Sequence, residues 1–186
     1  MKTTDFVKKF YSYAKDAELK TGINLEYILA RQALETGWGM NAPGNNCFGI
    51  KASKNWKGKT QLLKTHEHFA DDMQSYRFPH GVISITKKVG KNGKTYFDYL
   101  VWDLFRAYDS LTDCYVDHCQ FYFQNSRYAK ALKVKNDAKA FNRAVNEAGY
   151  STGTNVINTL NSIIDSISKI IEDEKLEATV KPLTKH

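Results

Sequence analysis

The spacing of apolar residues changes its period in the middle of the chain, and this change constrains the fold more than any other feature. Helical spacing dominates before residue 56 and after Ser110, whereas two β-branched segments, Val82 to Val89 and Thr95 to Phe105, flank Gly90-Lys91-Asn92-Gly93. Asn-Gly between two such runs is typical of a β-hairpin. The sequence therefore predicts a mostly helical α+β protein with a β-hairpin lobe inserted between two helical halves.

The helical halves contain several segments with apolar residues at intervals of three and four and with capping residues at their ends. The expected helices are residues 4–20 closed by Gly22, Asn24 to Gly37, the stripe that follows Ser110, Asn136 to Gly149, and Val156 to Ile171. Residues 56–68 are expected to include a short strand. Residues 1–173 form one predicted domain, and residues 174–186 form a polar C-terminal tail.

Composition excludes several classes of protein. The chain has 186 residues, 42% hydrophobic and 13% aromatic, which suffices for a core and argues against a wholly disordered chain. No run reaches the ~18–20 apolar residues of a membrane span, so we expect no stable membrane insertion. The start, MKTTDFVKKFYSY, lacks the small-residue cleavage site of a conventional signal peptide. Work outside the cytoplasm would therefore require another delivery route.

Charge and cysteine content limit the partners. A formal net charge of +7 suits an anionic partner or simply a soluble surface, and the absence of a recognised nucleic-acid motif argues against nucleic acid. Cys47, Cys114 and Cys119 are odd in number and form no Cys-x-x-Cys pair, so buried free thiols are expected. His118 lies between two of them, but no second ligand pair at metal spacing accompanies it, and no metal is expected.

Glu35 is the strongest candidate for chemistry. It stands in Ala33-Leu34-Glu35-Thr36-Gly37-Trp38-Gly39, at the last turn of an amphipathic helix. The negative end of the helix dipole and apolar surroundings would both disfavour an ionised carboxyl, as a general acid requires. The glycines allow backbone to approach a ligand, and Trp38 offers an aromatic face to a sugar. An exposed helix-end glutamate without a role is the alternative interpretation.

Further segments extend this signal into a resemblance. They are Ala42-Pro43-Gly44-Asn45-Asn46-Cys47-Phe48-Gly49-Ile50-Lys51, Phe105 to Ser110, Asn125 to Ala129 and Ala148 to Thr152. From about residue 3 to residue 171, and in the same order, the chain resembles glycoside hydrolase family 73. These are bacterial N-acetylglucosaminidases that include FlgJ-type flagellar proteins and many autolysins. The chain departs from the family pattern where Ser151-Thr152-Gly153-Thr154 replaces the usual Ala-Thr-Asp-Pro.

The resemblance implies a lysozyme-like fold and a cofactor-free hydrolase, with residues 1–173 as its glucosaminidase-like catalytic domain. Members cleave the β-1,4 bond between N-acetylglucosamine and N-acetylmuramic acid in the glycan strands of peptidoglycan. Glu35 matches their catalytic acid, which protonates the glycosidic oxygen. Their second carboxylate lies in a Thr-x-Glu context, which Thr65-His66-Glu67 matches, so Glu67 is the candidate base. Asp71 and Asp72 are its substitutes, and a substrate-assisted route through the 2-acetamido group stays open.

The resemblance also implies a set of cleft residues. Tyr150 joins the predicted catalytic residues, because it matches an aromatic position beside the reacting centre. Tyr128, Trp38 and Phe48 are predicted to contact sugar rings, and Asn46 to fix its loop or contact substrate. Ordinary packing in the core is the alternative for each of these side chains.

Two other functions fit the same fold. A muramidase or lytic transglycosylase would cut on the other side of muramic acid, and a catalytically inactive cell-wall-binding module would keep the fold alone. Phage lysis, effector secretion or flagellar-type export would each bring the protein to the periplasm or cell wall. An export, immunity or assembly partner is expected in some of these routes, and the sequence does not identify it.

Overall fold

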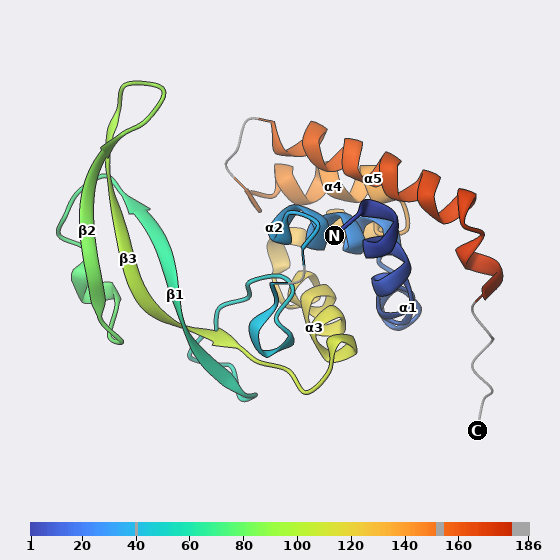
Figure 1. Ribbon diagram of the computed structural model, residues 1–186, viewed down its shortest axis with the longest axis horizontal. Coiled ribbons are helices and arrows are strands. Elements are labelled where there is room, and N and C mark those ends of the chain that lie inside the picture. Colours follow the sequence, from blue (N-terminus) through green and yellow to red (C-terminus); the bar gives the residue numbers. More distant parts are fainter. Residues whose placement is uncertain (40, 152–154, 180–186) are drawn as a thin grey trace. The chain divides into compact units, whose positions relative to one another are not determined.

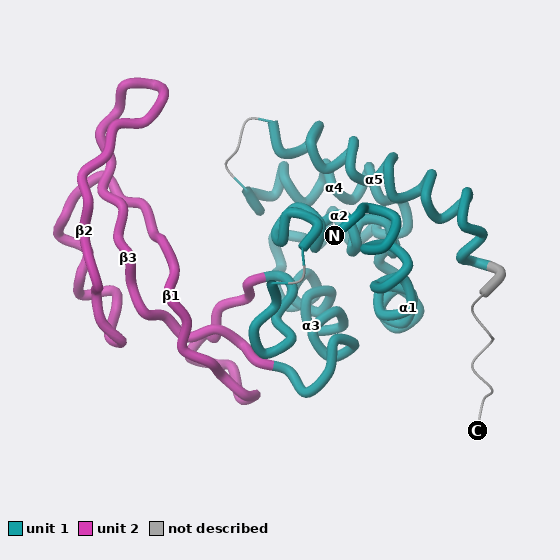
Figure 2. The backbone as a smooth tube through the Cα atoms, viewed as in Figure 1, with its two compact units in different colours: residues 1–48, 108–186 teal, residues 49–107 magenta. Residues whose placement is uncertain are grey.

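The computed structural model describes residues 1–39, 41–151 and 155–179, and the chain forms two compact units (Figure 2). Residues 1–48, together with the described residues from 108 onward, form a helical unit, and residues 49–107 form a sheet unit. The sheet unit is inserted in sequence between two helical parts of the chain. The predicted architecture of a β-lobe between helical halves is therefore confirmed.

The described residues of the helical unit form five α-helices (Figure 1): α1 (Thr3–Thr21), α2 (Leu25–Thr36), α3 (Leu111–Gln124), α4 (Ala138–Glu147) and α5 (Val156–Asp173). All the helices that the sequence predicts are present. Helix α5 runs alongside α4 and also packs on α2. The rings of Tyr27 from α2 and Phe141 from α4 meet edge to face at 4.7 Å, and both side chains are fully buried. Aromatic packing thus joins the helices at the centre of the unit.

Capping residues define most helix ends as the sequence predicts. The side chain of Asn24 accepts hydrogen bonds from the backbone N–H groups of Glu26 and Tyr27 at the start of α2. Gly37, with φ 58°, ends the same helix in the left-handed conformation that glycine adopts without strain. Ser110 caps α3 through the N–H of Asp113. Local hydrogen bonds therefore account for these boundaries.

The prediction that Asn136 caps α4 is wrong. The N-cap is Asp137, whose side chain accepts from the N–H groups of Lys139 and Ala140. Two adjacent residues carry suitable acceptors, and the helix begins after the second of them because its carboxylate suits the positive end of the helix dipole. Asn136 instead accepts, through its backbone carbonyl, a hydrogen bond of 3.4 Å from the side chain of Asn24.

The sheet unit contains three antiparallel strands in the order β1-β3-β2: β1 (Thr60–Phe69), β2 (Val82–Val89) and β3 (Thr95–Arg106). The predicted hairpin is confirmed as β2 and β3, and Gly93 at its turn has φ 75°. The strand expected within residues 56–68 is β1, which pairs with the other side of β3 and places Glu67 opposite Tyr99. The hairpin is therefore part of a larger sheet than the sequence indicates.

The two faces of the sheet differ. On one face Phe78, Tyr99 and Val101 form a small apolar core with Phe69, Val82 and Phe97 packed against it. On the other face Asp98 is buried, although it is charged, beneath His66 and Lys88. The register places these three side chains on neighbouring strands, so an ion-pair cluster covers that face.

The predicted polar tail begins in contact with the helical unit. Glu174 pairs with Lys8 of α1 at 2.6 Å, and a short 3-10 helix follows at Leu176–Thr179 with Leu176 buried. Part of the segment that departs from the family pattern, Thr152 to Thr154, lies outside the described residues. Residues 180–186 lie outside them as well. Within the described part of the chain, no helix is both long and apolar enough to cross a bilayer.

Candidate active site

Glu35 lies one residue before the end of α2, and the turn that follows leaves its side chain accessible. Gly37 and Trp38 both have positive φ values, 58° and 60°. The N–H of Trp38 donates to the carbonyl of Ala33 at 3.0 Å, and the N–H of Gly39 donates to that of Thr36 at 3.0 Å. The chain therefore folds back over the helix end, and the Glu35 side chain is 41% exposed.

The surroundings of Glu35 are not apolar, contrary to the expectation from the sequence. The Nη2 atom of Arg31 donates to Oε1 of Glu35 at 2.6 Å, and the Arg31 side chain is only 5% exposed. Residues four apart lie on the same face of a helix, which brings these two together. A buried guanidinium thus lies directly beside the carboxyl. The spacing of Arg31 and Glu35 is a signal that sequence analysis missed.

Tyr150 reaches the same place from the segment after α4. Gly149, with φ 83°, turns the chain, and the N–H of Tyr150 donates to the carbonyl of Val145 at 3.3 Å. The guanidinium of Arg31 lies over the Tyr150 ring, 4.5 Å from its centroid. Glu35, Arg31 and Tyr150 are therefore in one continuous series of contacts, which we call the Glu35 cluster.

A buried aromatic layer supports Tyr150. Its ring lies 5.7 Å from Tyr122, 6.1 Å from Phe121 and 6.2 Å from Tyr128. Tyr128 has no exposed surface, and burial raises its pKa. Its ring packs near that of Tyr150 and so helps to support it. The contact of Tyr128 with a sugar stays a prediction.

His118 and Phe48 belong to the layer below the cluster. Their rings stack in parallel at 3.9 Å, and Nε2 of His118 lies 3.4 Å from the Tyr122 hydroxyl. Burial, together with the charge of Arg31, lowers the pKa of His118 to about 3, so this imidazole is neutral near pH 7. Phe48 is 7% exposed and also packs edge-on against Tyr115. Its stacking on a sugar stays a prediction.

Trp38 and Asn46 lie in the loops that follow α2. Trp38 is half-buried and meets Phe6 edge to face at 5.3 Å. Asn46 is buried, and its N–H donates to the carbonyl of Pro43 at 3.1 Å. The neighbouring Asn45 donates from its side chain to the carbonyl of Tyr108 at 2.9 Å. These bonds hold the loop, and both predicted roles of Asn46 stay open.

Glu67 belongs to the sheet unit, where it is one of two carboxylates bound by Lys51. Lys51 donates to Glu67 on β1 and pairs with Asp103 on β3 at 2.9 Å. Burial alone would lower the pKa of Lys51, but its hydrogen bonds with Asp103 and Glu67 raise it. Glu67 is 28% exposed, so it is a partly buried ion-pair partner rather than a freely solvated strand residue. The two predicted carboxylates, Glu35 and Glu67, thus come from different units.

The substitutes for Glu67 lie in the turn after β1. Asp71 accepts from the N–H of Met73 at 2.9 Å and from the side chain of Gln74 at 2.8 Å. The bond from Gln74, followed by that from Met73, lowers the pKa of Asp71. Asp71 therefore stabilises its own turn, and Asp72 is exposed beside it.

The predicted free thiols are confirmed. Cys47, Cys114 and Cys119 are buried, and Sγ of Cys114 accepts from the N–H of Cys47 at 3.3 Å. Among the described residues, no group of three His, Cys, Asp or Glu side chains is arranged to hold a metal ion.

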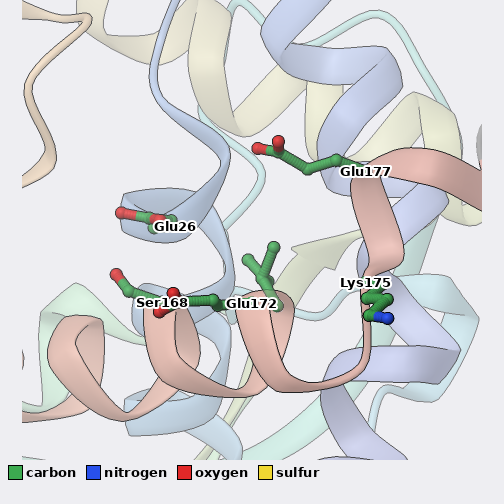
Figure 3. A pocket seen from close by; sticks show the side chains of 6 residues that line it. Glu26, Ser168, Glu172, Lys175 and Glu177 are labelled. Atoms are coloured by element: carbon green, nitrogen blue, oxygen red, sulfur yellow. The ribbon is translucent and has the colours of Figure 1, made fainter.

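A separate pocket of about 530 Å³ lies at the opposite end of α2 (Figure 3). Its described lining residues are Glu26, Ser168, Ile171, Glu172, Lys175 and Glu177, and they include none of the predicted site residues. Burial raises the pKa of Glu26. Glu26 is nine residues from Glu35, which corresponds to about 14 Å along a helix. The pocket is therefore distinct from the Glu35 cluster.

Comparisons with known proteins agree with the resemblance. The FlgJ peptidoglycan hydrolase of Vibrio parahaemolyticus is 31% identical over 156 residues, which are 79% of this chain and 42% of that protein. The structure of the glycoside hydrolase domain of Salmonella typhimurium FlgJ matches with a TM-score of 0.66 and 25% identity over 96% of each chain. A peptidoglycan hydrolase mutant from Sphingomonas sp. A1 matches with a TM-score of 0.63 and 27% identity, over 91% of this chain and 99% of that one.

These structures confirm the predicted lysozyme-like α+β fold. The chain spans less than half the length of the FlgJ relatives. The profile of the glucosaminidase family, described as mannosyl-glycoprotein endo-beta-N-acetylglucosaminidase, matches residues 11–169. The chain therefore belongs to the glucosaminidase family, glycoside hydrolase family 73.

Proposed function

We propose that the chain is a peptidoglycan hydrolase that cleaves the β-1,4 bond between N-acetylglucosamine and N-acetylmuramic acid. The match of residues 11–169 to the glucosaminidase family carries this proposal. The relatives named peptidoglycan hydrolase FlgJ indicate the polymer. The accessible carboxyl of Glu35, at the end of α2, is the group that supplies the proton.

The proposed reaction uses the chain's own side chains. Protonated Glu35 gives its hydrogen to the bridging oxygen as the bond from that oxygen to the anomeric carbon breaks, and the sugar gains oxocarbenium character. A water molecule adds its oxygen to the anomeric carbon. Glu67 is our candidate to accept the proton of this water, and the acetamido oxygen of the substrate is the alternative participant. Tyr150 borders the reacting centre.

We infer that the protein acts in the periplasm or cell wall after phage lysis, effector secretion or flagellar-type export, with the glycan strands of peptidoglycan as its partner. The relatives named peptidoglycan hydrolase FlgJ support this location, because peptidoglycan is the polymer of the cell wall. We propose that Trp38, Phe48 and Tyr128 contact the glycan. Asn46 is proposed to fix its loop or to contact the substrate. The proposal includes an export, immunity or assembly partner, as the delivery routes named above would require.

The products of digestion test the reaction. Purified sacculi are incubated with the protein, and the released muropeptides are analysed by mass spectrometry before and after reduction. N-acetylglucosamine at the reducing end supports the proposal. Reducing muramic acid would instead identify a muramidase, and anhydromuramic acid a lytic transglycosylase. Binding to sacculi without release of fragments would indicate an inactive wall-binding module.

Replacement of Glu35 tests its role. Glu35→Gln keeps the shape and the contact with Arg31 but has no proton to donate, so kcat should fall by about 10²- to 10⁴-fold. Glu147→Gln, at an exposed position of α4, is the matched control and should retain activity. Thermal melting confirms that both variants fold. Lysis by the Glu35→Gln variant at the parent rate would remove Glu35 from the mechanism.

A further inference from the structure

Most of the positive charge of the protein lies in the sheet unit. Residues 49–107 contain 11 Lys and Arg but only 5 Asp and Glu, a net charge of +6. The rest of the chain contains 16 basic and 15 acidic residues, so the helical unit carries a net charge of only +1. An anionic partner is therefore attracted to the inserted sheet far more than to the helical unit.

The two faces of the sheet carry different charges, because alternate residues of a strand point to opposite faces. Glu67 of β1 and Asp103 of the central strand β3 (Figure 1) share one face, where Lys51 binds both. We call the opposite face the Trp102 face. It consists of Lys64, His66 and His68 on β1, Ser84, Thr86 and Lys88 on β2, and the even-numbered residues from Tyr96 to Arg106 on β3. Asp98 is the one carboxylate among these residues, all of which the structure describes.

The Trp102 face is open to solvent, and its carboxylate is already paired. The side chains of His66 and His68 are each 60% exposed, and that of Lys88 is 46% exposed. Asp98 is buried and accepts from Lys88 and, at 2.8 Å, from His66, so it presents no unpaired negative charge to a partner. On the other face, Phe78 from the segment after β1 packs into the apolar core of the sheet.

Aromatic rings and basic side chains are neighbours on the Trp102 face. Nζ of Lys64 lies 5.1 Å from the centroid of the Trp102 ring, across the strand pair. His68 meets Tyr96 edge to face at 5.0 Å. Tyr96 and Trp102 are half-buried and six residues apart on β3, about 20 Å along a strand. A ring packs on the apolar side of a sugar, and an ammonium pairs with a carboxylate, so this face suits a sugar polymer that carries negative charge.

We propose that the Trp102 face is an accessory binding surface for a peptidoglycan strand, whose sugars pack on Trp102 and Tyr96 and whose peptide carboxylates pair with Lys64. The inference rests on the proposed function, which names the polymer. Glu67, the candidate base, lies on the opposite face, so this surface is distinct from the one that carries the proposed chemistry. A strand bound here raises the effective concentration of wall polymer around the enzyme between cleavage events.

Sedimentation with purified sacculi, in the Glu35→Gln background that leaves the polymer intact, tests the surface. Trp102→Ala should raise the dissociation constant by about 5-fold or more. Lys64→Glu should raise it by about 3- to 10-fold at low salt. Lys87→Glu is the matched control: it makes the same charge change at an exposed position of β2 on the opposite face, and its effect should stay below about 2-fold. Equal effects of the two lysine variants would show that only net charge acts and would overturn the proposal.

Uncharged chitin separates ring packing from charge. Trp102→Ala should weaken binding to chitin and to sacculi, whereas Lys64→Glu should weaken binding to sacculi alone. Should thermal melting show that Trp102→Ala does not fold, Trp102→Leu keeps an apolar side chain without the flat ring and should give the same pattern. Unchanged binding of the Trp102 variant to both polymers would reject the surface. Equally tight binding of single-stranded DNA, with the same loss in Trp102→Ala, would make it a general polyanion surface and reject the glycan as its partner.

Cleavage by proteins that retain Glu35 separates this inference from the proposed function. The parent and Trp102→Ala are compared on sacculi and on short soluble fragments of the same strands. The rate on sacculi should fall more than the rate on fragments, because a short fragment gains nothing from a second binding surface. Equal falls would place Trp102 at the reacting strand and overturn the accessory role. A parent that cleaves neither substrate would reject the proposed function, while the binding of sacculi would still decide the role of the Trp102 face.

Discussion

Two tyrosines of the helical unit, Tyr27 and Tyr122, bury their hydroxyl groups as a pair. The hydroxyls of Tyr27 and Tyr122 are 2.7 Å apart, and both residues have no exposed surface. Tyr122 also lies 3.4 Å from Nε2 of His118, whereas the hydroxyl of Tyr27 has no further hydrogen bond among the described residues. The aromatic layer under the Glu35 cluster therefore depends on one hydroxyl more than on the other.

Removal of these hydroxyls should have unequal effects. Tyr122→Phe leaves the buried hydroxyl of Tyr27 unpaired and should lower the free energy of unfolding by about 1–3 kcal/mol. Tyr27→Phe should cost less, because Tyr122 can still bond to His118. Urea unfolding measures both, with the exposed Tyr76→Phe as a control expected within about 0.5 kcal/mol of the parent. A larger loss for Tyr27→Phe than for Tyr122→Phe would contradict this account.

Helix α4 offers a test of how an element begins. Asp137→Ala removes the acceptor of two backbone N–H groups and should lower the free energy of unfolding by about 1 kcal/mol. Asn136→Ala is the matched control: its backbone carbonyl, which accepts from Asn24, is retained, so stability should change little. Denaturant unfolding of both variants distinguishes the two caps. Equal losses would mean that Asn136 caps the helix as much as Asp137 does.

The sheet depends on a buried charge shared by its three strands. Asp98 on β3 is 5% exposed and accepts from Lys88 on β2 and, at 2.8 Å, from His66 on β1. Its hydrogen bond with Lys88, followed by that with His66, lowers the pKa of Asp98 from 3.8 to about 2. A folded-state pKa below the unfolded value stabilises the fold above the unfolded pKa, and this contribution is lost as the pH falls through the folded value.

The difference in free energy of unfolding between the parent and Asp98→Asn should therefore depend on pH. It should be fully present above about pH 4, decline between about pH 4 and pH 2, and vanish below that window. Urea midpoints at a series of pH values measure it. Lys88→Met, which removes the hydrogen bond that lowers the pKa of Asp98 most, should weaken the same pH dependence. A difference that stays constant from pH 6 to pH 2 would show that Asp98 is not the titrating group.

The whole molecule carries 27 basic and 20 acidic residues, a formal net charge of +7. A cationic protein associates with an anionic polymer partly through long-range attraction, which salt screens. Under the proposed function the polymer is the cell wall, which carries carboxylates on its peptides, so charge should contribute to binding even where no side chain contacts the polymer specifically. This contribution belongs to the molecule rather than to the site.

Binding to sacculi should accordingly weaken with salt. The Glu35→Gln variant, which leaves the wall intact, is sedimented with sacculi from about 0.01 M to about 1 M salt, over which the Debye length falls from about 30 Å to about 3 Å. The bound fraction should decrease over this range. Binding to uncharged chitin is the control and should depend on salt much less. Equal salt dependence on both polymers would contradict a role for net charge.

Much of the fold was predictable because its signals are local. Asn24 and Gly37 mark the ends of α2 by backbone hydrogen bonds within a few residues, and Asn92-Gly93 marks the hairpin turn. The pairing of β1 with β3 was not predictable in this way, since a strand's periodicity does not name its partner. The cap of α4 was missed by one residue because two adjacent side chains carry suitable acceptors.

The amino-acid sequence by itself determined the fold class, the family and the position of Glu35 at the end of an amphipathic helix, because these follow from periodicity, caps and a long series of matching segments. Only the tertiary structure decided what surrounds that carboxyl. Arg31 lies one helical turn away, but its burial and its contact with Tyr150 depend on how α3 and the segment after α4 pack on α2. Burial and charge pairing are sums over residues distant in sequence, and local patterns do not contain them.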